Sequence, residues 1–280
     1  MQIRVGCQFR YGAPSPTPTV WQVRPRQDGA HRLLLASWTS EPTMPTASYY
    51  DAYGNTCDRL TLPEGPSRLR YDAVVDVSPS PDEADPDAAW VPVDELPPKV
   101  LVYLLPSRFC QADLLRPTAW ELFGGIPPGW RQVKAVCDWV NGHLTFGYGL
   151  SDPTMTALDA FESRHGVCRD FAHLGVALCR ALSIPARYTC GYLPDVGVQP
   201  PDAPMDFCAW FEAYLGGRWW TFDPRINIPR IGRVVIGRGR DAVDVAMVTA
   251  YGPVELAEMT VWADEVPPGR AGGSSRGSDR

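Results

Sequence analysis

A cysteine follows a glycine and a valine near the start of the segment GVCRDFAHLGVALCRALSIPARY, residues 166–188. Apolar residues recur at helical spacing after Cys168 and the pattern stops at Pro185, which predicts Cys168 in the first turn of a helix. The N–H groups and partial positive charge of a helix N-terminus stabilise a thiolate, and they can also hold an oxyanion. The segment therefore favours a cysteine nucleophile for acyl transfer, and a buried structural cysteine is the alternative.

A second segment, MDFCAWFEAYLGGRWWTFDP at residues 205–224, is typical of a β-hairpin. Gly216 and Gly217 favour a two-residue turn, and this turn fixes the register of the two strands. Side chains alternate along a strand, so Cys208 and Asp223 share one face as diagonal neighbours, roughly 7–8 Å apart at the backbone. A base at position 208 would be oriented by this carboxylate, as in a nucleophile–base–carboxylate triad. A plain hairpin with a structural aspartate is the alternative.

The expected base is missing, because position 208 is a cysteine and not a histidine. The chain has four histidines, namely His31, His143, His165 and His173. His165 precedes Cys168 by three residues and is the one candidate for a substitute base, but its position at the bend favours an exposed loop residue over that role. A thiol, with a pKa of about 8.5, is a poor general base at neutral pH, and a neighbouring carboxylate disfavours its thiolate further.

Four interpretations of Cys208 remain open. Cys168 could form thioesters with help from its helix, while Cys208 serves as a weak proton acceptor or a second acyl carrier. The two thiols could form a disulfide, or they could bind a soft metal such as zinc together with Asp223. Finally, the site could be inactive and the fold kept for binding. Trp210 and Tyr214 share the face of Cys208 and could shape an acyl cleft, but aromatic residues at such positions more often serve packing.

Composition excludes several classes of function. The net charge of -6 argues against a nucleic-acid partner. No apolar run approaches the roughly 20 residues of a membrane span, and the N-terminus lacks an apolar signal core, so we expect a cytoplasmic protein without a membrane partner. The eight cysteines include no C-x-x-C pair, so zinc-ribbon and thioredoxin motifs are absent.

The elements that must position the site fall into successive segments. Residues 1–78 contain short runs rich in β-branched and aromatic residues, which predict an N-terminal β-sandwich. Residues 79–93 are acidic and Pro-rich, with too little apolar material to pack, and are predicted as a linker. Residues 94–262 begin with helical patterns and continue as strands. Residues 263–280 are rich in Gly, Ser and Arg, which predicts a disordered tail.

The chain resembles the bacterial transglutaminase-like family. The similarity lies in TALDAFESRHGVCRDFAHLGVALCRALSIPARYTCGYLPD, in DFCAWFEAYLGGRWWTFDPR and in the N-terminal YYDAYGNTCDRLTLPEG. The resemblance implies an α+β fold, with a papain-like catalytic domain preceded by the β-sandwich domain. It further implies a Cys-His-Asp triad in which Cys168 is the nucleophile and Asp223 the orienting carboxylate, while Cys208 occupies the histidine position.

The resemblance also implies an activity. It favours a cysteine acyltransferase, amide hydrolase or peptidase that works through a Cys168 thioester without a cofactor, including amide-forming or cyclising enzymes of biosynthesis. The implied substrate is a peptide, an amide or a thioester-linked acyl group, and a carrier-bound acyl group is one form of it. The alternatives are an inactive transglutaminase-like binding protein and a redox or metal-binding cysteine pair.

Overall fold

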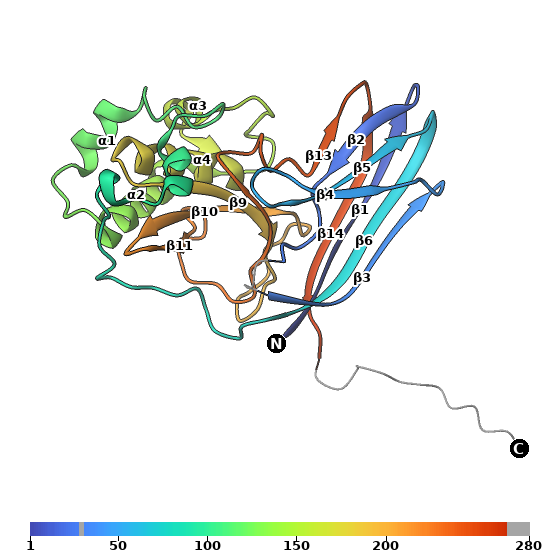
Figure 1. Cartoon of the computed structure of the whole chain (residues 1–280), viewed down its shortest axis with the longest axis horizontal. Coiled ribbons are helices and arrows are strands. Elements are labelled where there is room, and N and C mark those ends of the chain that lie inside the picture. Colours follow the sequence, from blue (N-terminus) through green and yellow to red (C-terminus); the bar gives the residue numbers. More distant parts are fainter. Residues whose placement is uncertain (28–30, 268–280) are drawn as a thin grey trace, which may run out of the picture.

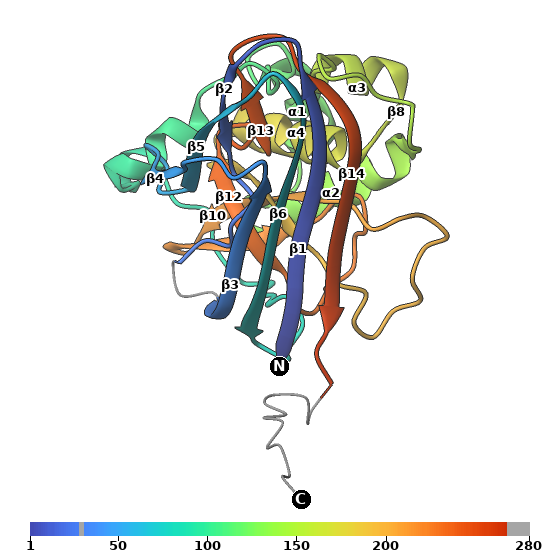
Figure 2. The ribbon, with the colours of Figure 1, turned by 90° about the vertical axis from the view of Figure 1, so that its right-hand side faces the viewer.

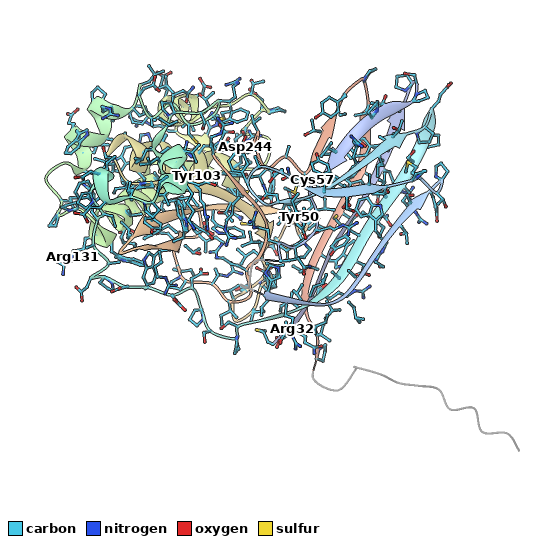
Figure 3. All side chains as sticks on the ribbon, in the orientation of Figure 1. Arg32, Tyr50, Cys57, Tyr103, Arg131 and Asp244 are labelled. Atoms are coloured by element: carbon cyan, nitrogen blue, oxygen red, sulfur yellow. The ribbon has the colours of Figure 1, made fainter. Side chains whose placement is uncertain are left out.

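The computed structural model describes residues 1–27 and 31–267. Two parts lie side by side in Figure 1: a helical part built on a sheet, and a β part made of long strands. Side chains fill the region between them in Figure 3, with Cys57 on the side of the β part and Tyr103 on the side of the helical part. No helix in these described ranges is both long enough and apolar enough to cross a membrane.

The β part consists of two four-stranded antiparallel sheets. The first has the order β14 (Glu255–Glu265), β1 (Gln2–Ala13), β6 (Gly65–Val77) and β3 (His31–Glu41). The second has the order β13 (Val248–Ala250), β2 (Thr17–Trp21), β5 (Thr56–Leu62) and β4 (Ala47–Tyr50). Both sheets contribute to one apolar core, which also takes in Tyr192 and Ile236 from the sheet of the helical part. This shared core fixes the two parts against each other.

The C-terminal strand β14 completes the sheet of the N-terminal strands, as Figure 2 shows. It runs through the expected boundary between residues 262 and 263, so residues 263–265 continue a strand instead of starting the tail. The helical part is therefore inserted between strands of the β part. Residues 268–280, the rest of the expected tail, lie outside the described residues.

The segment predicted as a linker, residues 79–93, is fixed along the surface of the helical part. Ala88 is buried in the helical core, and the indole N–H of Trp90 donates to the Ser183 carbonyl at 3.1 Å. The side chain of Asp82 accepts two hydrogen bonds from Arg233, at 2.9 and 3.0 Å. Polar and main-chain contacts thus hold a segment whose apolar content alone is too low to pack.

The helical part wraps helices around a four-stranded antiparallel sheet. The sheet has the order β11 (Arg218–Phe222), β10 (Cys208–Leu215), β9 (Ala186–Tyr192) and β12 (Val234–Gly239). The α-helices are α1 (Arg116–Phe123), α2 (Trp130–His143), α3 (Ala157–Ser163) and α4 (Cys168–Ala181). A short parallel pair joins β7 (Thr145–Phe146) to β8 (His165–Gly166). Two 3₁₀ helices, η1 (Val93–Glu95) and η2 (Pro98–Leu104), precede α1.

Helix α4 forms the centre of the helical part. Every residue from Asp170 to Ala181 is buried, and the helix packs against β9 and β10 as well as against the other three α-helices. Gly175 allows the close approach to β10, because a Cβ there would lie 2.6 Å from the ring of Phe211. The helix that begins at Cys168 is thus held on all sides, and its first residue has a fixed position.

Most local predictions for the helical part are confirmed. Helix α3 begins with a capping box, in which Thr156 and Asp159 exchange hydrogen bonds as the spacing T-x-x-D favours. The helical pattern after Asp94 forms two 3₁₀ helices instead of an α-helix, because the prolines of this segment cannot donate main-chain hydrogen bonds. Helix α1 was not predicted.

Candidate functional site

Cys168 is the first residue of α4, as predicted, and its side chain is partly exposed. The carboxylate of Asp170, three residues after the N-cap Val167, accepts the Val167 N–H at 2.8 Å. Arg169 forms an ion pair with the same carboxylate at 3.2 Å. These contacts fix the first turn of the helix, and they present the thiol of Cys168 at the positive end of the helix dipole.

An open cleft of about 940 Å³ lies in front of Cys168. One wall is the segment 193–207, which joins β9 to β10 and contains three prolines between residues 200 and 204. Residues 263–265 of β14 contribute to the rim, so the β part helps to form the site. A larger hollow of about 1210 Å³ lies between the ends of β1, β6 and β14, but its lining contains no cysteine or histidine. The cleft at Cys168 is therefore the candidate active site.

Cys208 is the first residue of β10, and its thiol interacts with that of Cys168. The hairpin has the predicted register, with Leu215 paired to Arg218, and both turn glycines have positive φ, 58° and 86°. The direct thiol-to-thiol interaction with Cys168, together with burial, raises the pKa of Cys208 well above its ordinary value. Cys208 is thus a protonated thiol near neutral pH and a poor proton acceptor.

Asp223 follows β11 directly and is buried. Its Oδ1 accepts the backbone N–H groups of Arg225 and Ile226, each at 3.1 Å. Its Oδ2 lies 3.0 Å from Nη2 of Arg233, whose side chain is only 6% exposed. Arg233 also forms an ion pair with Asp82, so a residue of the predicted linker helps to hold Arg233 against Asp223.

The proposed metal site is not supported. Both oxygens of Asp223 already have partners, and no group of three or more His, Cys, Asp or Glu side chains within residues 1–27 and 31–267 is arranged to hold a metal ion. Two thiols without a third ligand do not make a zinc site, which needs three or four protein ligands.

Arg225 is a residue of the site that the sequence analysis did not single out. Its Nη1 lies 3.9 Å from Sγ of Cys208, and its guanidinium carbon lies 4.0 Å from the ring centroid of Phe146. Burial opposes its charge, but Cys208, Cys168 and Asp223 together raise the pKa of Arg225. The hairpin register could have revealed it, because residue 225 shares the face of residues 208 and 223. A permanent cation therefore stands beside the two thiols.

Asp206 is a second residue of the site that sequence reasoning missed, although it lies only two residues before Cys208. It lines the cleft, and its Oδ1 accepts the backbone N–H of Phe207 at 2.7 Å. The carbonyl of Phe207 lies 3.9 Å from Sγ of Cys168. Burial raises the pKa of Asp206 above its usual range. A partly buried carboxylate that lines the same cleft as the nucleophile is a candidate proton acceptor.

None of the four histidines lines the cleft. His173 is buried on α4, where its Nε2 accepts the Ala242 N–H at 3.1 Å, and burial lowers its pKa well below the ordinary value. His143 stacks on Trp139, with ring centroids 4.1 Å apart. His165 belongs to β8, which places it in the short sheet beside the site and not in the cleft. His165 is therefore no substitute base in this arrangement.

Trp210 and Tyr214 do not line the cleft either. Trp210 is fully buried and packs in one cluster with Cys208, beneath the guanidinium of Arg233 at 4.7 Å. Tyr214 packs in a separate cluster with Leu96 and Val100. Both aromatic residues serve packing, the alternative that we preferred from the sequence. The aromatic residues in the lining of the cleft are Phe146, Tyr148 and Phe207.

A family model described as the transglutaminase-like superfamily matches residues 118–224, which include Cys168, Cys208 and Asp223. The chain is also similar to a solved structure from Cytophaga hutchinsonii that has been provisionally assigned as a cysteine protease. The two have 34% sequence identity and a TM-score of 0.87, and the match covers 94% of this chain and 90% of that one.

Two mycobacterial relatives have no assigned function. An uncharacterised protein of Mycobacterium leprae is 34% identical over 242 residues, which cover 80% of this chain and 82% of the relative. An uncharacterised protein of Mycobacterium tuberculosis is 27% identical over 269 residues, which cover 87% of this chain and 84% of the relative. The similarity thus extends over both parts of the fold and is not confined to the matched segment.

Proposed function

Because this chain belongs to the transglutaminase-like superfamily, we propose that it is a cysteine acyltransferase or amide hydrolase that works through a thioester on Cys168. The observation that carries the proposal is the partly exposed thiol of Cys168 at the start of α4, facing the cleft. The other seven cysteines are buried, so Cys168 is the thiol that a substrate can reach.

In the proposed reaction, Sγ of Cys168 attacks the carbonyl carbon of the acyl substrate. The oxyanion that forms is held by backbone N–H groups at the start of α4. When the intermediate collapses, the bond to the leaving amine, alcohol or thiol breaks, the leaving group takes up a proton, and the acyl group remains on Cys168 as a thioester. Water or an amine then attacks the thioester, which gives hydrolysis or acyl transfer.

The proton in this reaction needs a carrier other than histidine. Cys208 is held as a neutral thiol, so we assign it the role of a hydrogen-bond donor to Sγ of Cys168 and not that of a base. Asp206 is the proposed proton acceptor, and Arg225 the cation that stabilises negative charge on the sulfur. The proposed site therefore adds Asp206 and Arg225 to Cys168, Cys208 and Asp223. In it, Asp223 positions Arg225 by accepting the backbone N–H of Arg225.

The lining of the cleft suits an acyl chain or a peptide. Phe146, Ile226 and Met205 supply apolar surface, and the segment 193–207 forms a wall rich in proline. We propose a peptide, an amide or a thioester-linked acyl group as the substrate, and an amide-forming or cyclising step in biosynthesis as one setting for it. A cleft that opens widely at its rim can admit either water or an amine as the acceptor.

Capture of the acyl-enzyme tests the proposal. The protein is incubated with p-nitrophenyl acetate at neutral pH and quenched in acid, and its mass and acetylated peptide are determined. We expect one acetyl group per chain, on Cys168, which hydroxylamine removes as expected for a thioester. Acetylation spread over lysines, or no acetylation of Cys168, would contradict the proposal.

An inactive binding protein is the second candidate. The observation that favours it is the absence of histidine from the lining of the cleft. A binding protein would retain peptides or acyl amides in the cleft without releasing product. Equilibrium binding measured together with turnover separates the two candidates.

Asp206→Asn is expected to lower the kcat/KM of ester hydrolysis by up to about 10²-fold at pH 8, because the amide cannot accept a proton. Burial raises the pKa of Asp206, so its basic form is present only above that raised pKa. Wild-type activity should therefore fall as the pH drops through this pKa, and the variant should lack this acid limb. Asp202→Asn, on the same wall but outside the lining, is the control. An identical acid limb in both variants would exclude Asp206 as the base.

A further inference from the structure

Two thiols of the cleft lining interact with each other, and they differ in exposure. Cys168 is partly exposed, whereas Cys208 is buried at 5% exposure. An accessible cysteine next to a protected second thiol is the arrangement of a reactive cysteine with a resolving partner. The hydrogen bond that Cys208 donates in acyl transfer does not use the redox chemistry of two neighbouring thiols, which is a second capacity of the pair.

The surroundings distinguish Cys168 from the other cysteines. Those cysteines are buried, whereas Cys168 is partly exposed. Cys168 also has the start of α4 and the guanidinium of Arg225 near it. Arg225 has no ion-pair partner among the residues that the structure describes, and its one side-chain hydrogen bond is to Sγ of Cys208. Its remaining N–H donors are available to a ligand in the cleft.

We propose that the Cys168–Cys208 pair reduces hydroperoxides, with Cys168 as the attacking thiolate and Cys208 as the resolving thiol. The substrate is a hydroperoxide, ROOH, that enters through the cleft. Arg225 and the N–H groups at the start of α4 stabilise the negative charge that develops on the departing oxygen. This reaction goes beyond acyl transfer and does not depend on it.

The chemistry balances in two steps followed by reduction. The sulfur of Cys168 attacks the terminal oxygen of ROOH, an S–O bond forms as the O–O bond breaks, and the alkoxide takes up a proton to leave as ROH. Cys168 is now a sulfenic acid, oxidised by two electrons. The sulfur of Cys208 then attacks the sulfur of Cys168, the S–S bond forms, and the hydroxyl group leaves with the thiol proton as water. A dithiol such as dithiothreitol supplies two electrons and two protons and restores both thiols.

The test uses the full chain, reduced, desalted and treated with tert-butyl hydroperoxide at neutral pH. We expect the loss of two hydrogens in the intact mass, a linked peptide pair that joins Cys168 to Cys208, and full reversal by dithiothreitol. Cys208→Ala should instead accumulate a sulfenic acid on Cys168, which dimedone traps. Cys190→Ala, which removes the neighbouring buried thiol, should leave the link unchanged. A link from Cys168 to Cys190, or no oxidation of Cys168, would overturn the proposal.

The proposed role of Arg225 is tested by comparing the rate of Cys168 oxidation in variants of this residue. Arg225→Gln should slow oxidation of Cys168 by about tenfold, and Arg225→Lys should restore part of the rate because the charge returns. Arg218→Gln removes an exposed arginine from the same hairpin and should leave the rate unchanged. Circular dichroism confirms that each variant is folded. Equal rates in folded Arg225→Gln and wild-type protein would overturn the assignment of Arg225. These readouts follow sulfur oxidation alone, so they stand whether or not the chain transfers acyl groups.

Discussion

Cys168→Ala is expected to lower the kcat/KM for an activated ester or amide by at least about 10³-fold, because no other thiol can form the thioester. The other seven cysteines are buried, including Cys208, which is 5% exposed. Stability should change little, since Cys168 is partly exposed and occupies the first position of α4. The measurement is steady-state turnover together with the mass of the acyl-enzyme.

The matched control is Cys179→Ala. It removes a thiol from the same helix, but one that is buried in the helical core and far from the cleft lining. We expect this variant to retain its activity at a temperature where it is folded. If Cys168→Ala keeps more than a tenth of the wild-type activity while Cys179→Ala loses it, the nucleophile has been assigned to the wrong residue.

Cys208→His is expected to raise ester hydrolysis by about 10²-fold or more over Cys208→Ala, because general-base assistance is typically worth ~10²–10⁴-fold. Asp223 can orient the new imidazole, since a carboxylate has about four acceptor sites. Two of these, both on Oδ1, accept backbone N–H groups, and Oδ2 forms only an ion pair with Arg233. The activity should rise with pH through the imidazole pKa, near 6.5, because the neutral ring is the base.

Cys208→Ala is the reference for this comparison because it removes the thiol without adding a base. Adding Cys168→Ala to the histidine variant reports the background from the imidazole alone. A histidine variant no faster than the alanine variant would mean that Asp223, held by Arg233 and Asp82, no longer orients a base at position 208. The histidine variant should also lose the Cys168–Cys208 link after peroxide treatment, since its second thiol is gone.

The sequence by itself determined the local features of the site. The start of α4 at Cys168 follows from the apolar spacing after it and from the stop at Pro185. The register of β10 and β11 follows from two glycines that can adopt positive φ, and this register puts residues 208 and 223 on one face. These features depend on residues close together in the sequence, so the pattern of residue types along the chain is sufficient to predict them. The α+β class came instead from the resemblance to the transglutaminase-like family.

Only the tertiary structure decided which groups surround the two thiols. The guanidinium of Arg225 reaches Cys208 through the turn after β11, and a loop conformation of this kind is set by the hydrogen bonds of Asp223. Asp82 reaches Arg233 across about 150 residues of sequence, and β14 returns from the C-terminus to close the N-terminal sheet. Such long-range contacts leave no periodic signal in the chain. A buried charge needs a partner of opposite charge, and the exposed edge of a sheet can pair with a further strand. Many segments of the chain could supply such a partner or such a strand, so the sequence alone does not identify the one that does.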